Sequence, residues 1–411
     1  MIAGIAGGVL AACGGNDGST LVQPAPPVTA SSATPDVVLV ACDRGAPLWV
    51  ASQNDGGPWA TATVTRSGRY EISFPSGKGG LIVVDTSGGS IRTNVLYMAA
   101  DEFAGMIQRT DTTRTCTPRS TSVTVAGLRA ADLAHIGLGG GTGWSASNRL
   151  ATRITEVGRL SVSLAAARVQ QGTQRADMII LRRDIPFAGP HTVLDFGSSE
   201  AIPLDSVPFS VANTGGQSVS LGIALLSHTL GGASVELDGA SLAGDGTVQM
   251  RRIPGAALHT GDVHYVFARS GFPQPRQVES YTAAAGPITM TLGPALSEPV
   301  LSSAGSSRPR MRISAQSEYA TAAQASYFQP SARFVTVTMS ARYLGGAPAT
   351  WDLVPPDLTG VAGWNPSWAL VTAQATWQAN GFGGPLESAS TAALLGRTVR
   401  IALQQGTIQV F

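Results

Sequence analysis

The sequence predicts a mainly β protein made of tandem antiparallel β-sandwich domains, with at most one or two short helices. The 411-residue chain contains 49 glycines and 25 prolines, which are residues that turns use often. Only 13% of its residues are charged, a composition that disfavours long solvated helices. Runs of strand length with period-2 alternation recur between turn signals at intervals of about 8 to 12 residues, which is typical of β-sandwiches and barrels.

The chain opens on the apolar run MIAGIAGGVLAA at residues 1–12. This length suits the core of a signal peptide and falls short of the roughly 18 apolar residues of a membrane-spanning helix. No Lys or Arg precedes the run, so either the natural start lies upstream of Met1 or the run is not a signal peptide. Leu10, Ala11, Ala12 and Cys13 resemble the lipobox of bacterial lipoproteins. The resemblance implies that the Cys13 thiol receives a diacylglycerol and that the chain is cut directly before it.

Residues 13–35 are expected to form a lipidated cysteine and a flexible linker. The segment GGNDGSTLVQPAPPVTASSATP, at 14–35, is rich in Gly, Ser, Thr and Pro, as flexible tethers are. Stable anchoring takes about two acyl chains, and the modified cysteine of a lipoprotein supplies them. We therefore expect an exported protein held in a lipid bilayer at the cell envelope. In a Gram-negative host the resemblance favours the outer membrane, because no aspartate follows Cys13 directly.

Cys42 and Cys116 are expected to form a disulfide. Export would place them in an oxidising space, where thiols pair. The bridge would close a loop of about 75 residues, for which chain entropy estimates a stabilisation of roughly 4 kcal/mol. Two free buried thiols are the alternative. A metal site is disfavoured because no histidine lies near either cysteine in the sequence.

Four β-sandwich segments are expected after the linker, at 36–117, 118–195, 196–292 and 293–411, and the last two could form one lobe. Short helices are expected at 99–109 and 388–396. The expected strands are LWVAS, ATATVTRSGRYEISF and GGLIVVD in the first segment, TSVTVAGLRAADLAHIGLGGG, RLSVSLAAARV and ADMIILRRDI in the second, VSLGIALLS, ASVELDGASLAGDGTVQMRRI, DVHYVFARSG and PITMTLG in the third, and RMRISAQSEY, FVTVTMSARYLG, TWDLVPPDL, WALVTAQATWQAN and RTVRIALQQGTIQVF in the fourth.

The run FVTVTMSARY illustrates the expected two-faced strands. Its dry face is expected to consist of Val335, Val337, Met339 and Ala341, and its solvated face of Thr336, Thr338, Ser340 and Arg342. One dry and one wet face are what a sandwich sheet requires.

The stretch TVAGLRAADLAHIGLGG at 124–140 resembles the start of transthyretin-like or carboxypeptidase-regulatory-like sandwich domains. The layout from Cys13 onward resembles that of multi-domain β-sandwich envelope lipoproteins of environmental bacteria. These resemblances imply immunoglobulin-like or transthyretin-like sandwiches and an envelope location, and they bring no catalytic residues.

Known catalytic and cofactor motifs are incomplete. GWSASN (143–148) lacks the second glycine of a nucleophile elbow, FPSGKGG (74–80) lacks the hydroxyl of a phosphate loop, and GLGGGTG (137–143) lacks the last glycine of a dinucleotide loop. All three are expected to be hairpin turns. HTGDVHY (259–265) is interpreted as a solvated hairpin, because its ligand spacing is looser than that of real zinc sites. No catalytic residue, metal or other cofactor is therefore predicted.

Function is expected to lie in binding. The formal net charge is +1, so no nucleic-acid partner is predicted. The leading hypothesis is a non-enzymatic, membrane-anchored envelope lipoprotein with a structural, binding or adhesion role toward a polysaccharide or an envelope protein. The alternative is a carbohydrate-binding surface protein that uses Trp364 and Trp368 as stacking platforms, although burial of both indoles in a core is the commoner arrangement. A third hypothesis is an exported hydrolase whose site carries no sequence motif.

Overall fold

The computed structural model separates Met1–Thr34 from a compact unit, Pro35–Phe411. The structure describes residues 35–40, 47–65, 69–87, 89–103, 118–138, 141–145, 151–157, 161–170, 172–173, 175–186, 192–227, 234–283, 286–305, 307–386 and 395–410, all of them in the compact unit. Most of the expected helix at 99–109 and of the expected helical turn at 388–396 lies outside the described residues.

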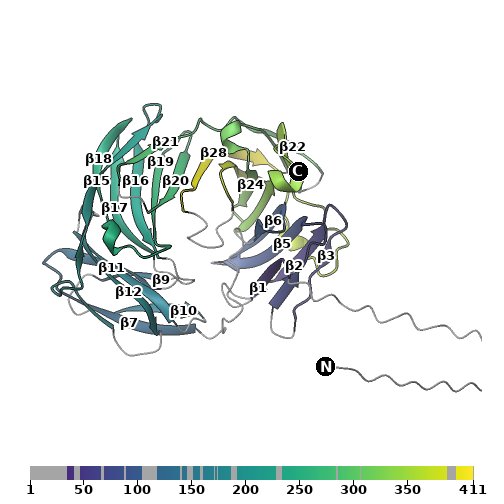
Figure 1. Ribbon diagram of the computed structural model, residues 1–411. Helices are drawn as coiled ribbons and strands as arrows, with labels where there is room; N and C mark the ends of the chain where they lie inside the picture. The colour runs from purple at the N-terminus through teal and green to yellow at the C-terminus, as the bar shows by residue number, and fades with distance from the viewer. Residues whose placement is uncertain are drawn as a thin grey trace, which may run out of the picture. The chain divides into compact units, whose positions relative to one another are not determined.

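The described residues fold mainly as β-strands (Figure 1), which confirms the predicted fold class. The largest sheet runs in the order β17 (Ser234–Leu242), β16 (Val219–Leu226), β19 (Val263–Ser270), β20 (Arg276–Thr282), β28 (Thr398–Gln409), β27 (Gln374–Gly383), β24 (Ala322–Gln329), β25 (Arg333–Ser340), β6 (Ser90–Ala99), β5 (Lys78–Ser87), β2 (Trp49–Asn54) and β3 (Ala60–Thr61).

Smaller sheets accompany it. Their orders are β1 (Val37–Val40) and β4 (Arg69–Ile72); β22 (Val300–Ser303), β23 (Pro309–Ser314) and β26 (Thr350–Leu353); β18 (Gly246–Arg252), β15 (Asp205–Ala212) and β21 (Ile288–Thr291); β14 (Ile202–Pro203), β12 (Arg175–Pro186), β11 (Ser161–Gln170), β8 (Asp132–Leu138) and β9 (Gly141–Ser145); and β10 (Ala151–Val157), β7 (Pro118–Ala126) and β13 (Thr192–Asp195).

Most strand pairings are antiparallel, but β7–β13, β15–β21 and β6–β25 are parallel. The β6–β25 pairing has a consequence for the layout of the chain. It hydrogen-bonds a strand from the expected segment 36–117 to a strand from 293–411. The large sheet therefore continues across those two segments.

One core serves the first and last segments together. It lies between the large sheet and the sheet β22–β23–β26, and it combines Trp49 and Val95 with Tyr327, Trp351 and their neighbours. A second core combines buried residues of β11 and β12 with buried residues of the consecutive strands from β15 to β21. A third core lies between strands β8, β11 and β12 on one side and strands β7 and β13 on the other. The division into four segments remains a prediction. The structure shows that the first and last of these segments share one core.

Among the described residues, an apolar cluster covers only part of the opposite face of the large sheet. At β5 and β6 this face carries Leu81 and Leu96, which pack with Tyr70 of β4 and with Phe103 in that cluster. Farther along the sheet, on β24, β27 and β28, this face carries mostly uncharged polar side chains.

The strand expected at FVTVTMSARY ends earlier than predicted. Val335 and Val337 are buried in the shared core as expected, but Thr338 and Ser340 are buried as well, so the prediction that they are solvated was wrong. The reason is a covering contact, since the Ser340 hydroxyl donates to the buried Glu102 carboxylate. Ser340 also accepts from the Tyr343 backbone N–H as an N-cap, which starts the single-turn helix α2 (Ala341–Leu344).

The glycine-rich stretch at 137–143 is a hairpin, as predicted. Its strands β8 and β9 pair antiparallel, with Leu138 opposite Gly141. Gly137 allows β17 to approach the hairpin backbone closely, because a Cβ at this position would lie 2.2 Å from the Ser234 carbonyl oxygen.

Candidate binding surfaces

The three cysteines predicted as the lipidation site and the disulfide, Cys13, Cys42 and Cys116, lie outside the described residues. Within the described residues, none of the helices has the length and apolar character that crossing a membrane would require.

The predicted platform residues Trp364 and Trp368 lie together in a cluster with Trp49. Trp368 ends a 3-10 turn, Pro366–Trp368, whose N-cap Asn365 accepts from the Ser367 backbone N–H at 3.0 Å. The ring centroids of Trp364 and Trp368 are 5.3 and 6.1 Å from that of Trp49 and 5.5 Å from each other.

The geometry of this cluster resembles a loop staple more than a flat platform. The planes of Trp364 and Trp368 are inclined at 80° to each other, and both indoles are half-buried against the shared core. The indole N–H of Trp49 donates to the Ala362 carbonyl at 3.2 Å. Trp364 also lines a small apolar pocket with Leu358 and Arg308. Most of the other lining residues are aliphatic, so a ligand in this pocket would meet mainly aliphatic groups.

A more exposed tryptophan lies elsewhere, at Trp144 on the edge strand β9. Its side chain is 51% exposed, and it stacks on His135 of β8 with a centroid distance of 4.2 Å and an interplanar angle of 5°. His135 Nδ1 accepts from the Glu236 backbone N–H at 3.1 Å. Burial lowers the pKa of His135, although that hydrogen bond acts in the opposite direction. Sequence reasoning did not single out this pair, because the two residues become neighbours only through strand pairing.

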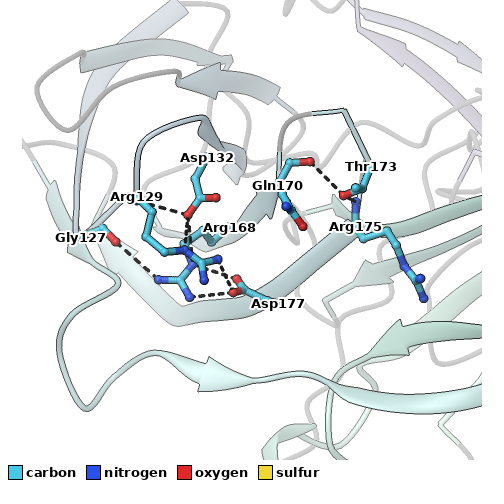
Figure 2. A network of polar contacts seen from close by, with 8 residues as sticks. All are labelled: Gly127, Arg129, Asp132, Arg168, Gln170, Thr173, Arg175 and Asp177. Carbon is cyan, nitrogen blue, oxygen red and sulfur yellow. Dashed lines mark hydrogen bonds and ion pairs between the residues drawn. The ribbon is translucent and has the colours of Figure 1, made fainter.

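A cluster of charged side chains links the β8, β11 and β12 strands (Figure 2). Arg168 donates to both carboxylate oxygens of Asp177 at 2.8 Å, and Arg129 reaches Asp132 at 2.8 Å and Asp177 at 2.6 Å. Arg168 also donates to the Gly127 carbonyl at 3.5 Å. Two arginines and two aspartates thus form ion pairs with one another.

The electrostatics of this network mark it as structural. Burial alone would raise the pKa of Asp177, but hydrogen bonds and charges from Arg168 and Arg129 outweigh burial and lower it. The Asp132 hydrogen bond raises the pKa of Arg129. Asp177 and Arg129 therefore stay ionised at neutral pH, and each is paired within the network, so neither offers a proton or an unpaired charge to a substrate.

The HTGDVHY turn is not a solvated hairpin, and that interpretation was wrong for two of its residues. Asp262 and His264 are 2% and 1% exposed. Asp262 accepts from the His259 backbone N–H at 3.0 Å and pairs with Arg183, while His264 Nε2 accepts from the Ile253 backbone N–H at 3.2 Å. Within the part of the chain that the structure describes, no three His, Cys, Asp or Glu side chains gather so as to hold a metal ion.

A row of uncharged polar side chains crosses the large sheet on the face opposite the shared core. Pairing register places Gln405 of β28 opposite Gln378, Gln378 opposite Ser326, and Ser326 opposite Thr336, which lies beside Asn94 of β6. The adjacent row contains Thr407, Thr376, Phe328, Phe334 and Arg92 in the same strand order. We call these two rows the polar strip.

The polar strip leaves a weak signal in the sequence. In QATWQAN the polar residues of β27 alternate with Ala375, Trp377 and Ala379, which belong to the shared core. Alternation shows that one face is uncharged and polar, but not which strands lie beside it. The strip is therefore visible only once the strand order is known.

Comparison with protein-family models and with curated proteins gives no match for the chain.

Proposed function

We propose that the chain is a non-enzymatic lipoprotein of the bacterial cell envelope, anchored through acylated Cys13 and displaying a β-rich binding unit. The observation that carries the proposal is Leu10-Ala11-Ala12-Cys13 followed by the Gly-, Ser- and Pro-rich stretch 14–35. The compact unit begins at Pro35, where this tether would end. An outer-membrane location and a Cys42–Cys116 disulfide belong to the same proposal.

A binding role agrees with the chemistry of the described residues. The charged network of Arg129, Asp132, Arg168 and Asp177 is closed on itself, and the buried Asp262 and His264 use their acceptor atoms within the protein. The sheet face and the exposed rings, by contrast, present hydrogen-bonding and stacking groups outward. Binding of a polysaccharide or of an envelope protein would use such surfaces.

Metabolic labelling with a palmitate analogue tests the anchor. The gene is expressed in a bacterial host with its natural start, beside a Cys13→Ala variant. We expect label and membrane fractionation in the natural chain and neither in the variant. Equal label in both chains would refute the anchor.

Thiol counting tests the disulfide. Exported protein is denatured without reductant and alkylated, and the mass of the peptides that contain Cys42 and Cys116 is measured. We expect neither thiol to be alkylated before reduction and both afterwards. Alkylation of both before reduction would show that the two thiols are free.

A further inference from the structure

The polar strip combines uncharged polar side chains with two phenyl rings on one sheet face. Gln405, Thr407 and Thr376 are exposed, and Gln378 and Thr336 are half-buried. Phe328 and Phe334, both half-buried, meet edge to face with centroids 5.3 Å apart and an interplanar angle of 71°. Arg92 lies over the Phe334 ring at 5.6 Å and is the single cation of the strip.

The amides of this face are held in a directed chain of hydrogen bonds. Gln378 Nε2 donates to Asn380 Oδ1 at 3.0 Å, and Asn380 Nδ2 donates to Gln324 Oε1 at 2.8 Å. Gln324 Nε2 in turn donates to Thr338 Oγ1 at 2.9 Å. Ser326 and Thr336 share a hydrogen bond of 3.2 Å. These hydrogen bonds orient the Gln378 side chain before any ligand arrives, which lowers the entropic cost of binding.

Hydrogen-bonding capacity remains after these contacts. A primary amide has two N–H donors and a carbonyl with two lone pairs. Gln378 uses one N–H in the chain, which leaves its second N–H and its oxygen for a partner. A side chain that both donates and accepts matches a hydroxyl group, which does the same.

Charge and strand order restrict the class of ligand that the polar strip can bind. With Arg92 alone at one end, the strip offers no row of cations to an anionic polymer. Its strands β28, β27, β24, β25 and β6 are all interior strands of the large sheet, so no backbone edge is open for a peptide to add as a further strand. Recognition must therefore proceed through side chains that present neutral hydrogen bonds beside two apolar rings.

We propose that the polar strip binds a neutral polysaccharide that lies across the strands. A sugar ring has hydroxyl groups on its edge, which match the amide row, and C–H groups on its face, which would contact the apolar phenyl groups of Phe328 and Phe334. These two rings meet at 71°, so they offer an apolar surface beside the amides and not a flat stacking platform. Neighbouring strands are about 4.8 Å apart, comparable with the length of one sugar residue, so successive strands meet successive sugars. The inference gives the proposed function a ligand class and rests on it, because export is what would bring the strip to a polysaccharide.

Isothermal titration of the full chain carrying Cys13→Ala tests this site independently of the anchor. The probes are neutral hexasaccharides of β-glucan, xylan and mannan, with hexagalacturonate as the anionic counterpart. We expect at least one neutral probe to bind and the Gln378→Ala/Gln405→Ala pair to weaken it about tenfold or more. Thr376→Val, at an exposed position and nearly isosteric, should weaken it in the same direction without a change in thermal unfolding.

Matched substitutions outside the strip supply the control. Gln249→Ala removes an exposed glutamine from β18 in a different sheet, and it should change affinity less than about twofold. Trp364→Ala and Trp144→Ala should likewise leave binding intact. Binding that is lost in either tryptophan variant but kept in the glutamine pair would overturn the site. Failure of every neutral probe at millimolar concentration, or tighter binding of hexagalacturonate, would overturn the ligand class.

Discussion

Burial of one histidine, His264, sets a pH dependence of stability. Burial, followed by the charge of Arg252, lowers its pKa from 6.5 to about 4, although Asp262 and a backbone hydrogen bond act in the opposite direction. Between these two values the unfolded chain binds a proton that the folded chain does not. Stability is therefore complete above pH 6.5 and falls as the pH drops toward 4, by about 1.4 kcal/mol per pH unit at most.

Urea unfolding at pH 6.5 and pH 5 measures this effect. The free energy of unfolding should fall by about 2 kcal/mol from this group alone. His264→Gln keeps an acceptor for the Ile253 N–H but does not titrate, so it should reduce the difference by that amount. An unchanged difference in the His264 variant would contradict the assignment.

Arg276 is a buried cation that holds several chain segments together through backbone carbonyls. The side chain is 8% exposed. Its guanidinium donates to the carbonyls of Asn213, Thr214 and Gly293 and to Gln217 Oε1. Arg276→Met would leave these acceptors unpaired, and we expect a loss of about 3 kcal/mol or more. Arg269→Met, at an exposed position on the adjacent strand β19, should cost less than about 1 kcal/mol. Equal losses in chemical denaturation would contradict this role.

At the scale of elements, β27 depends on a close approach to the 3-10 turn Ser317–Tyr319. A Cβ at Gly383 would lie 1.7 Å from the Glu318 carbonyl oxygen, and a backbone atom cannot move aside cheaply. Gly383→Ala should therefore lower the free energy of unfolding by about 3 kcal/mol or more. Gly271→Ala, which meets no atom within 4 Å, should leave it unchanged or raise it by up to about 1 kcal/mol. Calorimetry measures the melting temperature of both variants. Similar melting temperatures for Gly383→Ala and Gly271→Ala would refute the steric argument.

Strands with clean alternation were predictable from the sequence, and strands without it were not. FVTVTMS and QATWQAN alternate because one face meets the shared core, and both occur as β25 and β27. β6 was not predicted, because Val95 to Ala99 are all buried, so the period-2 signal disappears. β24 was also missed, since Ala322, Ala323 and Ala325 are small residues with weak strand preference. Both strands are central to the large sheet, so the polar strip could not be assembled from sequence alone.

At the scale of the whole molecule, the shared cores decide which parts can fold alone. Residues 118–292 contain all the buried residues of the two cores around β11, β15 and β7. Residues 35–117 contain one apolar cluster of their own, but Trp49, Ile82 and Val95 belong to a core completed by residues 296–410. Among the described residues, β20 of 118–292 pairs with β28 of 293–411, and this pairing involves no residue of 35–117.

Two fragments of the chain test this division of stability. Fragment 118–292 should unfold cooperatively in urea with dispersed amide resonances, because its apolar faces stay covered. Fragment 35–117 should show neither property, because one face of its β2–β5–β6 sheet would expose the apolar side chains that normally belong to the core shared with residues 296–410. Adding residues 293–411 in trans should restore order in fragment 35–117 through the parallel β6–β25 pairing. Cooperative unfolding of fragment 35–117 alone would instead make its own cluster, built around Phe74 and Phe103, sufficient for folding, and the large sheet would then join two independently stable parts.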